Sequence, residues 1–410
     1  MESSLNVVIV GNGIAGITAA KAIKESTPET QVSVFTDENN QYYPRPRLYD
    51  VLSGHVKPED AVMFSEDHYK TSGILIQLNK KASYIDTKNK KLLLDDKTKV
   101  SYDKLLLANG AHCFVPPIKG VNKKGVFTLR TINDALAINE FAKKIKKSII
   151  IGGGLLGLEF ASALNKLGQQ VTVVEMFSRL LPKQLDEKGA TILKTKVESR
   201  GIKIVLGAKI TEVLGNSKVS AIMLENGKKI SGNLLLFSAG IRSNIGLALE
   251  SGIKTNRGVI VDNQLRTNVD GIYASGDVAE FEDKVYGIIP AAIEQAKIAA
   301  TNITGKELQR YKGTVVSNTL RVINIELTSI GIVNPEDKKL EEIQEIDKQK
   351  GVYKKLVFDQ GKIVGAIFLG NRKNVVPIKN LIAQETDITR YKDLLLKEDF
   401  DYKKINARIR

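Results

Sequence analysis

A glycine-rich turn near the N-terminus is the first stretch of the sequence whose residue types and spacing suggest chemistry. Gly11, Gly13 and Gly16 follow the apolar run VVIV and have the spacing G-x-G-x-x-G. In such a unit the first glycine allows a tight turn, the second lets backbone approach a pyrophosphate, and the third lets helix pack on strand. The helix N-terminus then offers N–H groups and a positive dipole end to phosphates. A purely structural turn is the alternative for a single motif of this kind.

The same spacing recurs at Gly152, Gly154 and Gly157, between the strand-like run SIII and a helix-like segment. Glu175 closes the next apolar run, VTVV, 23 residues after Gly152. An acid at about this distance binds the adenosine ribose 2′-OH and repels a 2′-phosphate, so Glu175 favours NADH over NADPH. The alternative for Glu175 is a solvated acid at a strand end.

Two such turns about 140 residues apart predict two bound dinucleotides and two nucleotide-binding domains, one cofactor handing electrons to the other. The flanking apolar runs predict the elements that must hold the turns. These are strands at 7–10 and 31–35 around the first helix, and strands at 148–151 and 171–174 around the second, with Gly168 at the end of the second helix.

The counts of cysteine and histidine exclude several kinds of site. Cys113 is the one cysteine, and the histidines are His55, His68 and His112. A cysteine-ligated iron–sulfur cluster needs about four thiolates, a structural zinc site needs four Cys/His ligands, and a disulfide needs two thiols. We therefore predict no metal site. The adjacent His112 and Cys113 favour loop packing over a protease dyad.

Composition places the chain among ordinary globular proteins with two or three domains. Its 410 residues are 42% hydrophobic and 26% charged, and Lys+Arg exceed Asp+Glu by 61 − 46 = 15. This positive charge indicates either a lysine-rich solvated surface or a face that steers an acidic partner. Nucleic acid binding is disfavoured because the charge is scattered. The sequence predicts no membrane span and no secretion signal, hence a cytoplasmic protein. No pattern specifies an oligomeric state.

Over residues from 5 to about 300 the sequence resembles the two-dinucleotide flavoprotein family of pyridine nucleotide-dependent reductases, with FAD on the first turn and NAD(P)H on the second. Residues 105–120, with Ala108-Asn109-Gly110 in place of the usual Ala-Thr-Gly, resemble the exit from the FAD domain. Residues 234–244 resemble the second crossing. The resemblance implies that Arg130 reaches the flavin region and that Asp277, in TNVDGIYASGDVA, bonds the ribityl chain.

The first nucleotide unit departs from the family in one position. Thr36 stands where the second unit has Glu175, so a hydroxyl, or Asp37 or Glu38 reaching round, would have to replace the acid that holds the FAD ribose. Ala82 lies where the family uses backbone to hold adenine.

The segment QYYPRPRLYDVLSG, 41–54, lies where the disulfide reductases of the family carry a redox cysteine. It resembles instead the arginine–proline segment of the rubredoxin reductase, ferredoxin reductase and nitrite reductase flavoprotein branches. This resemblance implies that Arg45 and Arg47 lie along the FAD pyrophosphate or ring edge, where the guanidinium fork suits phosphate oxygens. Surface arginines on a proline-stiffened loop are the alternative.

Residues 317–332 and 353–382 resemble the C-terminal domain of NADH:rubredoxin reductases, with a hairpin turn at Gln360-Gly361.

The reaction that the resemblance implies passes hydride from NADH to FAD. Glu159 would position the nicotinamide, and the alternative for Glu159 is a solvated acid on a helix. Electrons then pass from the flavin edge to an external acceptor, an acidic protein such as rubredoxin. Ferredoxin, a nitrite reductase partner, and oxygen or peroxide are the alternative acceptors, and a non-enzymatic flavin scaffold is the rival from another class.

The predicted fold is α/β, with a split FAD-binding domain (1–115 and 235–305), an inserted NAD(H)-binding domain (116–234) and a C-terminal α+β domain (306–410). The predicted cofactor-binding residues, for FAD and NAD(H) together, are Gly11, Gly13, Ala15, Gly16, Thr36, Arg45, Arg47, Ala82, Asn109, Gly110, Arg130, Gly276, Asp277, Gly152, Gly154, Leu155, Leu156, Gly157, Glu175 and Gly240.

Overall fold

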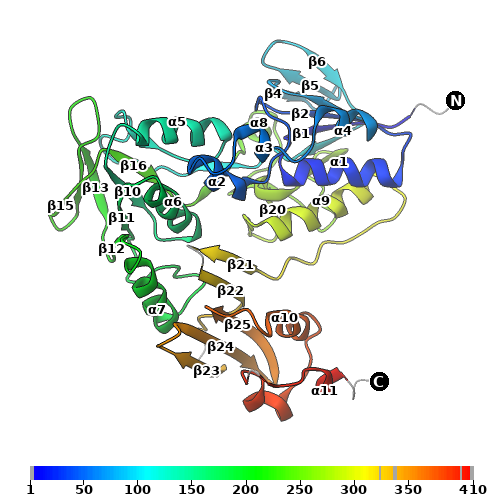
Figure 1. The fold of residues 1–410 in the computed structure, drawn as a ribbon. Helices are drawn as coiled ribbons and strands as arrows, with labels where there is room; N and C mark the ends of the chain where they lie inside the picture. The colour runs from blue at the N-terminus through cyan, green and yellow to red at the C-terminus, as the bar shows by residue number, and fades with distance from the viewer. Residues whose placement is uncertain (1–3, 323–324, 336–338, 398, 407–410) are drawn as a thin grey trace. The chain divides into compact units, whose positions relative to one another are not determined.

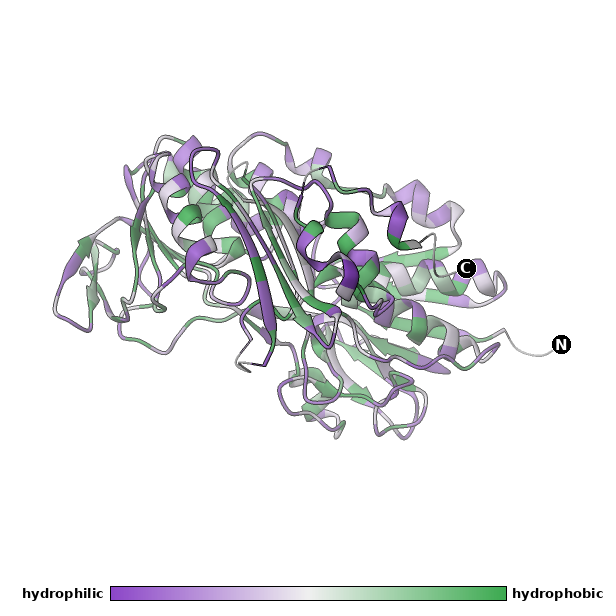
Figure 2. Ribbon diagram, turned by 90° about the horizontal axis from the view of Figure 1, so that it is seen from below, coloured by the Kyte–Doolittle hydropathy of each residue, from purple (hydrophilic) through white to green (hydrophobic). Residues whose placement is uncertain are grey.

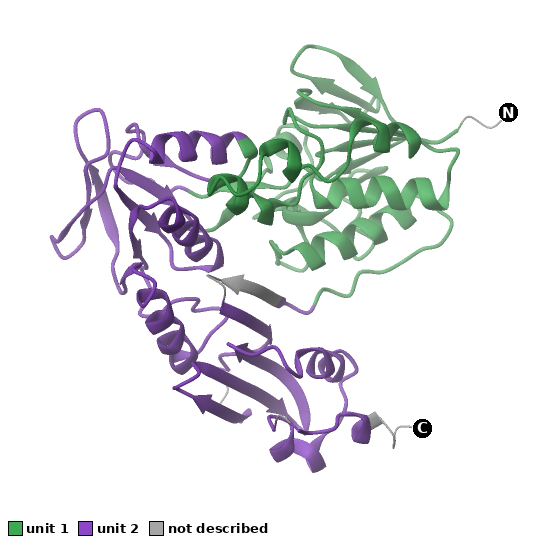
Figure 3. Ribbon diagram, viewed as in Figure 1, with its two compact units in different colours: residues 1–114, 130–132, 240–314 green, residues 115–129, 133–239, 315–410 purple. Residues whose placement is uncertain are grey.

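The computed structural model describes residues 4–322, 325–335, 339–397 and 399–406. The chain consists of two compact units, each made of several segments (Figure 3). Unit 1 contains residues 1–114, 130–132 and 240–314, and unit 2 contains residues 115–129, 133–239 and 315–410. The three-domain boundaries expected from the sequence stay a prediction.

A parallel sheet forms the centre of unit 1. Its strand order is β19-β7-β1-β2-β3, and each neighbouring pair is parallel. Because both faces of such a sheet are covered, its strands are continuous apolar runs; Val7, Val8 and Ile9 are fully buried. The strands are β1 (Asn6–Val10), β2 (Gln31–Phe35), β3 (Ile74–Gln77), β7 (Lys104–Leu107) and β19 (Ile272–Ala274).

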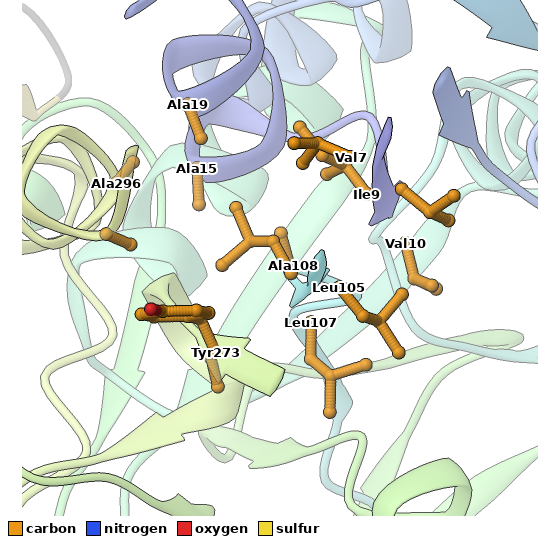
Figure 4. Close-up of a cluster of buried hydrophobic side chains, with 14 of the residues drawn as sticks. Val7, Ile9, Val10, Ala15, Ala19, Leu105, Leu107, Ala108, Tyr273 and Ala296 are labelled. Carbon is orange, nitrogen blue, oxygen red and sulfur yellow. The ribbon is translucent and has the colours of Figure 1, made fainter. Parts of the chain in front are cut away.

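Two helices, α1 (Ile14–Ser26) and α9 (Ile289–Thr304), lie side by side in unit 1 (Figure 1). Ala15 and Ala19 of α1 and Ala296 of α9 belong to the same buried cluster as strand residues of β1 and β7, as Figure 4 shows. Small side chains allow the two helices to approach closely. This packing fixes the N-terminus of α1 over the end of β1.

Smaller elements complete unit 1. A three-stranded antiparallel sheet β4-β5-β6 and two short strand pairs, β8 with β17 and β18 with β20, lie within its described residues. Their bounds, with those of the short helices, are β4 (Ala82–Asp86), β5 (Lys91–Leu94), β6 (Lys99–Ser101), β8 (Ala111–Cys113), β17 (Ile241–Ser243), β18 (Val259–Ile260), β20 (Ala279–Glu280), η1 (Arg45–Arg47), α2 (Leu48–Leu52), α3 (Pro58–Ala61), α4 (Glu66–Thr71), α8 (Gly246–Glu250) and η2 (Gly276–Val278).

Unit 2 contains a second parallel sheet, of order β12-β11-β10-β16-β9. Its strands are apolar, and Ile149, Ile150 and Leu235 are fully buried. Figure 2 shows hydrophobic residues in green on both strands and helices of the chain. The elements of this part of unit 2 are β9 (Val126–Phe127), α5 (Ile132–Ala142), β10 (Lys147–Ile151), α6 (Leu155–Lys166), β11 (Gln170–Val174), α7 (Glu187–Glu198), β12 (Lys203–Val205), β16 (Leu234–Phe237) and the antiparallel trio β13 (Ile210–Leu214), β14 (Ala221–Leu224) and β15 (Lys229–Ser231). Helix α5 begins at Ile132, which is assigned to unit 1.

An antiparallel sheet of order β21-β22-β25-β24-β23 forms the C-terminal part of unit 2. The predicted hairpin is confirmed: Asp359 pairs with Lys362 around Gln360 and Gly361, which have φ of 45° and 80°. Two positive φ values are what a two-residue type I′ turn requires. The bounds are β21 (Ser317–Val322), β22 (Ile325–Gly331), β23 (Glu341–Asp347), β24 (Val352–Asp359), β25 (Lys362–Leu369), α10 (Val375–Ala383), η3 (Thr389–Leu394) and α11 (Lys403–Asn406).

A polar cluster joins this sheet to α7 within unit 2. Lys355 of β24, whose side chain is 3% exposed, lies 3.3 Å from Asp186 and 2.8 Å from Glu342. Asp186 also caps α7 by accepting from the Gly189 N–H, and it accepts a hydrogen bond from the Tyr353 hydroxyl. Burial, together with Asp186, raises the pKa of Tyr353.

Two parallel sheets flanked by helices, with an antiparallel sheet after them, confirm the predicted fold class. It is α/β with two Rossmann-type sheets and a C-terminal α+β segment.

Candidate dinucleotide-binding sites

The turn between β1 and α1 is built so that two of its glycines cannot be replaced without movement. Gly11 has φ of +107°, and a Cβ on it would lie 2.3 Å from the Ala108 carbonyl oxygen. A Cβ on Gly16 would lie 1.9 Å from the Gly11 carbonyl oxygen. Both positions therefore bring backbone against backbone, which gives the close packing that the sequence motif predicts.

Gly13 is different, because a Cβ on it would meet no described atom within 4 Å. It is the N-cap residue of α1, and no side chain caps this helix in the described structure. The first-turn N–H groups of a helix lack intrahelical acceptors and attract anions. A glycine facing open space at this point fits the close approach of a pyrophosphate.

The turn between β10 and α6 repeats this geometry. Gly152 has φ of +112°, with a Cβ position 2.3 Å from the Ser238 carbonyl oxygen, and Gly157 would meet the Gly152 carbonyl oxygen at 1.9 Å. Gly154 caps α6 without a side-chain hydrogen bond and again faces open space. Leu155 and Leu156 form the first turn of α6, and Leu156 is 47% exposed.

Three polar side chains, each with a buried polar atom, follow the ends of adjacent strands in the unit 1 sheet. Asn12 comes after β1, Asn109 after β7 and Ser275 after β19. The Asn12 Nδ2, Asn109 Oδ1 and Ser275 Oγ atoms are buried and have no hydrogen-bond partner among the described residues. Buried polar atoms without partners are costly, so a group that accepts and donates hydrogen bonds is expected here. This is the carboxyl edge of the sheet, where α/β proteins bind ligands, and the residues fit FAD.

Arg130 and Asp277 form an ion pair at this edge, 3.0 Å apart. Gly276, with φ of +80°, lies against α1, since a Cβ on it would be 2.8 Å from the Ala15 Cβ. Its N–H donates to the Gln295 side chain. The structure thus brings together Arg130, Gly276, Asp277 and the first turn of α1, which the sequence placed in one site.

Arg45 joins this cluster but Arg47 does not. The Arg45 guanidinium donates to the Arg130 carbonyl oxygen at 2.8 Å and forms an ion pair with Glu38. Arg47 instead donates to the carbonyl oxygen of Asp60 at an exposed position, which fits the alternative of a surface arginine. The Tyr43 hydroxyl donates to Glu38, and burial raises the pKa of Tyr43.

The two crossing segments of unit 1 are joined to each other. Strands β8 and β17 are antiparallel. The Asn109 amide donates to the Asn244 carbonyl oxygen at 2.9 Å, and the Asn244 amide donates to the Asn109 carbonyl oxygen at 2.7 Å. The Phe114 N–H donates to the Gly240 carbonyl oxygen, and both Gly110 and Gly240 have positive φ.

The remaining predicted residues lie as follows. Glu175 is buried, and its carboxylate accepts hydrogen bonds from the N–H groups of Gly153 and Phe177. Thr36 is equally buried and accepts weakly, at 3.3 Å, from the Glu38 N–H. Glu159 is half-buried on α6. Ala82 begins β4, in a sheet separate from the one that carries the turns.

The sequence did not reveal that Glu38 pairs with Arg45 or that Gln295 accepts from the Gly276 N–H, because no local pattern specifies these contacts and only the folded chain brings the partners together. It also passed over Asn12, the residue inside the first G-x-G, although an asparagine there was visible in the sequence. Within the residues that the structure describes, no group of three or more His, Cys, Asp or Glu side chains could hold a metal ion. In the same residues, no helix is long and apolar enough to cross a membrane.

Two glycine-turn sites on two parallel sheets are typical of proteins that bind two dinucleotides. The chain is a member of the pyridine nucleotide-disulphide oxidoreductase family, whose model matches residues 5–296. The model of the rubredoxin NAD+ reductase C-terminal domain matches residues 317–386. Members of the family use FAD and NAD(H).

The chain is 35% identical over 384 residues to the nitrite reductase [NAD(P)H] of Bacillus subtilis. The matched region covers 93% of this chain and 48% of the relative. It therefore spans about half the length of this relative. It is 29% identical over 371 residues to the NADH-rubredoxin oxidoreductase of Clostridium acetobutylicum, covering 90% of this chain and 93% of that one. The crystal structure of the Clostridium acetobutylicum enzyme matches with a TM-score of 0.77 and 28% identity, covering 94% and 96% of the two chains.

Proposed function

We propose that the chain is an NADH-dependent flavoprotein reductase that passes electrons from NADH through FAD to a separate electron-transfer protein, rubredoxin being the best candidate. The observation that carries the proposal is the repeated turn, with open space in front of Gly13 and Gly154, combined with buried unpartnered polar atoms at the edge of one sheet. Family membership supports both cofactors.

Unit 1 would hold FAD through the first turn of α1 and the surrounding strand ends. The N–H groups near Gly13 would bind the pyrophosphate, and Asp277, held in place by its ion pair with Arg130, would offer a carboxylate to the ribityl chain. Arg45 is oriented by Glu38 and by the Arg130 carbonyl oxygen, so it braces Arg130. Bound FAD supplies the acceptance of two electrons from NADH and their release to an acceptor.

Unit 2 would hold NADH at the turn around Gly154. The Glu175 carboxylate is fixed by the Gly153 and Phe177 N–H groups, so it is in place to accept from a ribose hydroxyl and to repel a 2′-phosphate. Leu155 and Leu156 offer first-turn N–H groups. Positioning of the nicotinamide by Glu159 stays a prediction.

Rubredoxin is favoured as acceptor by the C-terminal match at 317–386 and by likeness to an NADH-rubredoxin oxidoreductase along nearly the whole of both chains. A net charge of +15 would speed the encounter with an acidic partner. The single cysteine, Cys113, cannot form a redox pair within the chain. A cytoplasmic location stays a prediction.

The second candidate is the flavin-containing part of a nitrite-reducing system. The 35% identity to the Bacillus subtilis nitrite reductase, in which the match spans about half of the relative, favours it. The two candidates differ in the acceptor and share both nucleotide sites.

Anaerobic rapid mixing tests the proposal. The FAD-loaded protein is mixed with NADH, and flavin absorbance is followed, then reoxidation is measured with rubredoxin, ferredoxin, nitrite reductase partner domains, oxygen and peroxide. We expect bleaching faster than about 1 s⁻¹ and the fastest reoxidation by rubredoxin, slowing as salt is raised. Bleaching slower than this rate would favour a flavin scaffold. Rubredoxin reduction without salt dependence would contradict electrostatic steering.

A further inference from the structure

The two glycine turns are equivalent position by position, so each serves as a reference for the other. The Gly11 N–H donates to the Phe35 carbonyl oxygen at 2.7 Å, and the Gly152 N–H donates to the Val174 carbonyl oxygen at 2.8 Å. In the strand registers, Val10 pairs with Phe35 as Ile151 pairs with Val174. Thr36 therefore corresponds to Glu175, and Asn12 to Gly153.

In the second turn, Glu175 occupies the space next to Gly153. Its carboxylate accepts from the Gly153 N–H. A Cβ on Gly153 would lie 2.6 Å from the Leu180 Cδ2, 3.1 Å from the Glu175 Cβ and 3.2 Å from a carboxylate oxygen. A side chain at position 153 would therefore compete for space with the Glu175 carboxylate and with Leu180. The combination of glycine on the loop with glutamate at the strand end resolves this competition.

The first turn has the opposite combination of side chains. Asn12 places a long polar side chain on the loop, and the short side chain of Thr36 follows the end of the strand. Asn12 is 9% exposed, and its Oδ1 accepts from the Tyr69 hydroxyl at 3.1 Å. That bond assigns the other end of the amide, Nδ2, as a buried donor that no described residue accepts from.

The neighbouring groups that could replace the acid are engaged or exposed. Thr36 Oγ1 accepts from the Glu38 N–H, and Glu38 is held by Arg45 and Tyr43. Asp37 is exposed. A buried amide donor without a partner costs free energy unless a ligand accepts from it. Asn12 has at this turn a buried amide donor that no described residue accepts from.

We infer that the Asn12 side-chain amide holds the adenosine ribose of FAD, donating from Nδ2 to a ribose hydroxyl oxygen and replacing the acid that is missing at Thr36. The inference rests on the proposed function, because it takes FAD to be the ligand of the first turn. Tyr69 acts as a positioning residue, since its hydroxyl fixes the orientation of the amide.

The test measures FAD binding by the apoprotein, using quenching of flavin fluorescence. The ligands are FAD and FAD analogues that lack the adenosine 2′- or 3′-hydroxyl. We expect the wild-type protein to bind one deoxy analogue about three- to tenfold more weakly than FAD, which is the range for one hydrogen bond. Asn12→Gly should bind FAD more weakly by the same factor and should no longer distinguish the analogue from FAD.

Two further variants separate this role from a structural one. Asn12→Gly with Thr36→Glu recreates the arrangement of the second turn and should recover the affinity and the discrimination that Asn12→Gly loses. Asp37→Asn is the matched control and should leave both unchanged. Melting of each apoprotein checks that the variants fold.

The outcomes discriminate between the two levels of the proposal. FAD binding with unchanged discrimination in Asn12→Gly, or discrimination lost in Asp37→Asn, would overturn the role of Asn12 and leave the proposed function standing. A folded wild-type protein that fails to bind FAD would overturn both. Recovery by the double variant supports the inference even if Asn12→Gly lowers stability, because a purely structural asparagine would not be replaced by a glutamate at position 36.

Discussion

Replacing Gly154 with alanine should separate nucleotide binding from folding. Gly154 has φ of −76° and ψ of 180°, an extended conformation that alanine adopts without strain. The added methyl group would meet no described atom within 4 Å. Alanine is a poorer N-cap than glycine but lowers the entropy of the unfolded chain, so the free energy of unfolding should change by less than about 1 kcal/mol.

The effect on NADH should be much larger, because the methyl group would occupy the space through which backbone N–H groups reach the pyrophosphate. Hydrogen bonds to charged groups contribute about 1.5–3 kcal/mol each, so the loss of two of them costs at least about 3 kcal/mol. This corresponds to an increase of about 150-fold or more in the dissociation constant for NADH.

The assay combines urea unfolding with a binding titration of the oxidised, FAD-loaded protein. The titrant is an NADH analogue that reduces the flavin slowly or not at all. Gly168→Ala is the matched control at the other end of α6, where φ is +78° and space is also open. It should lower the free energy of unfolding by about 1 kcal/mol and leave NADH affinity unchanged. Unchanged NADH affinity in Gly154→Ala would refute the assignment of this turn to the pyrophosphate.

Three other predictions concern nucleotide choice, the C-terminal cluster and alkaline stability. Glu175→Ala should lower the NADH-to-NADPH ratio of kcat/KM by about tenfold or more, because the carboxylate that repels a 2′-phosphate is gone; an unchanged ratio would count against Glu175 as the selecting acid. Asp186→Ala should reduce the free energy of unfolding by about 3 kcal/mol in urea, since buried Lys355 loses a partner and α7 loses its cap, and a loss below about 1 kcal/mol would show that the cluster is marginal. Burial, with a smaller contribution from Asp86, raises the pKa of Tyr102 to about 12, so the stability that this side chain contributes is complete below pH 10 and is lost as the pH rises towards 12. Tyr102→Phe should flatten the fall in unfolding free energy between pH 10 and 12 by up to about 1.4 kcal/mol per pH unit, and identical slopes for the two proteins would contradict this cause.

The parts of the structure that follow from short-range pattern could be predicted from the sequence. Apolar runs at 7–10 and 148–151 followed by G-x-G-x-x-G determine a buried strand, a tight turn and a helix, because each step depends on neighbours in the chain. The hairpin at Gln360-Gly361 is predictable for the same reason.

Contacts between segments far apart in sequence could not be predicted in this way. The stretch YKKLVF contains Lys354 and Lys355, which a pattern of charge would place in solvent, yet both are buried in β24. Lys355 is compensated by Asp186, nearly 170 residues earlier, and only the fold brings the two together. Arg45 and Arg47 are separated by a single residue and look equivalent in sequence, but the 3-10 turn directs them to different partners.

The cluster around Asp186 bears on how proteins of this kind can be recombined. A Cβ on Gly189 would lie 3.0 Å from the Tyr353 ring, so α7 and β24 fit each other in shape as well as in charge. A chimera that takes the segment 317–386 from a relative would place foreign side chains against Asp186 and Gly189. Exchange of this segment should therefore succeed when the residues of α7 that face β24 are exchanged with it. The surface of α7 and the C-terminal segment would then have to be inherited together.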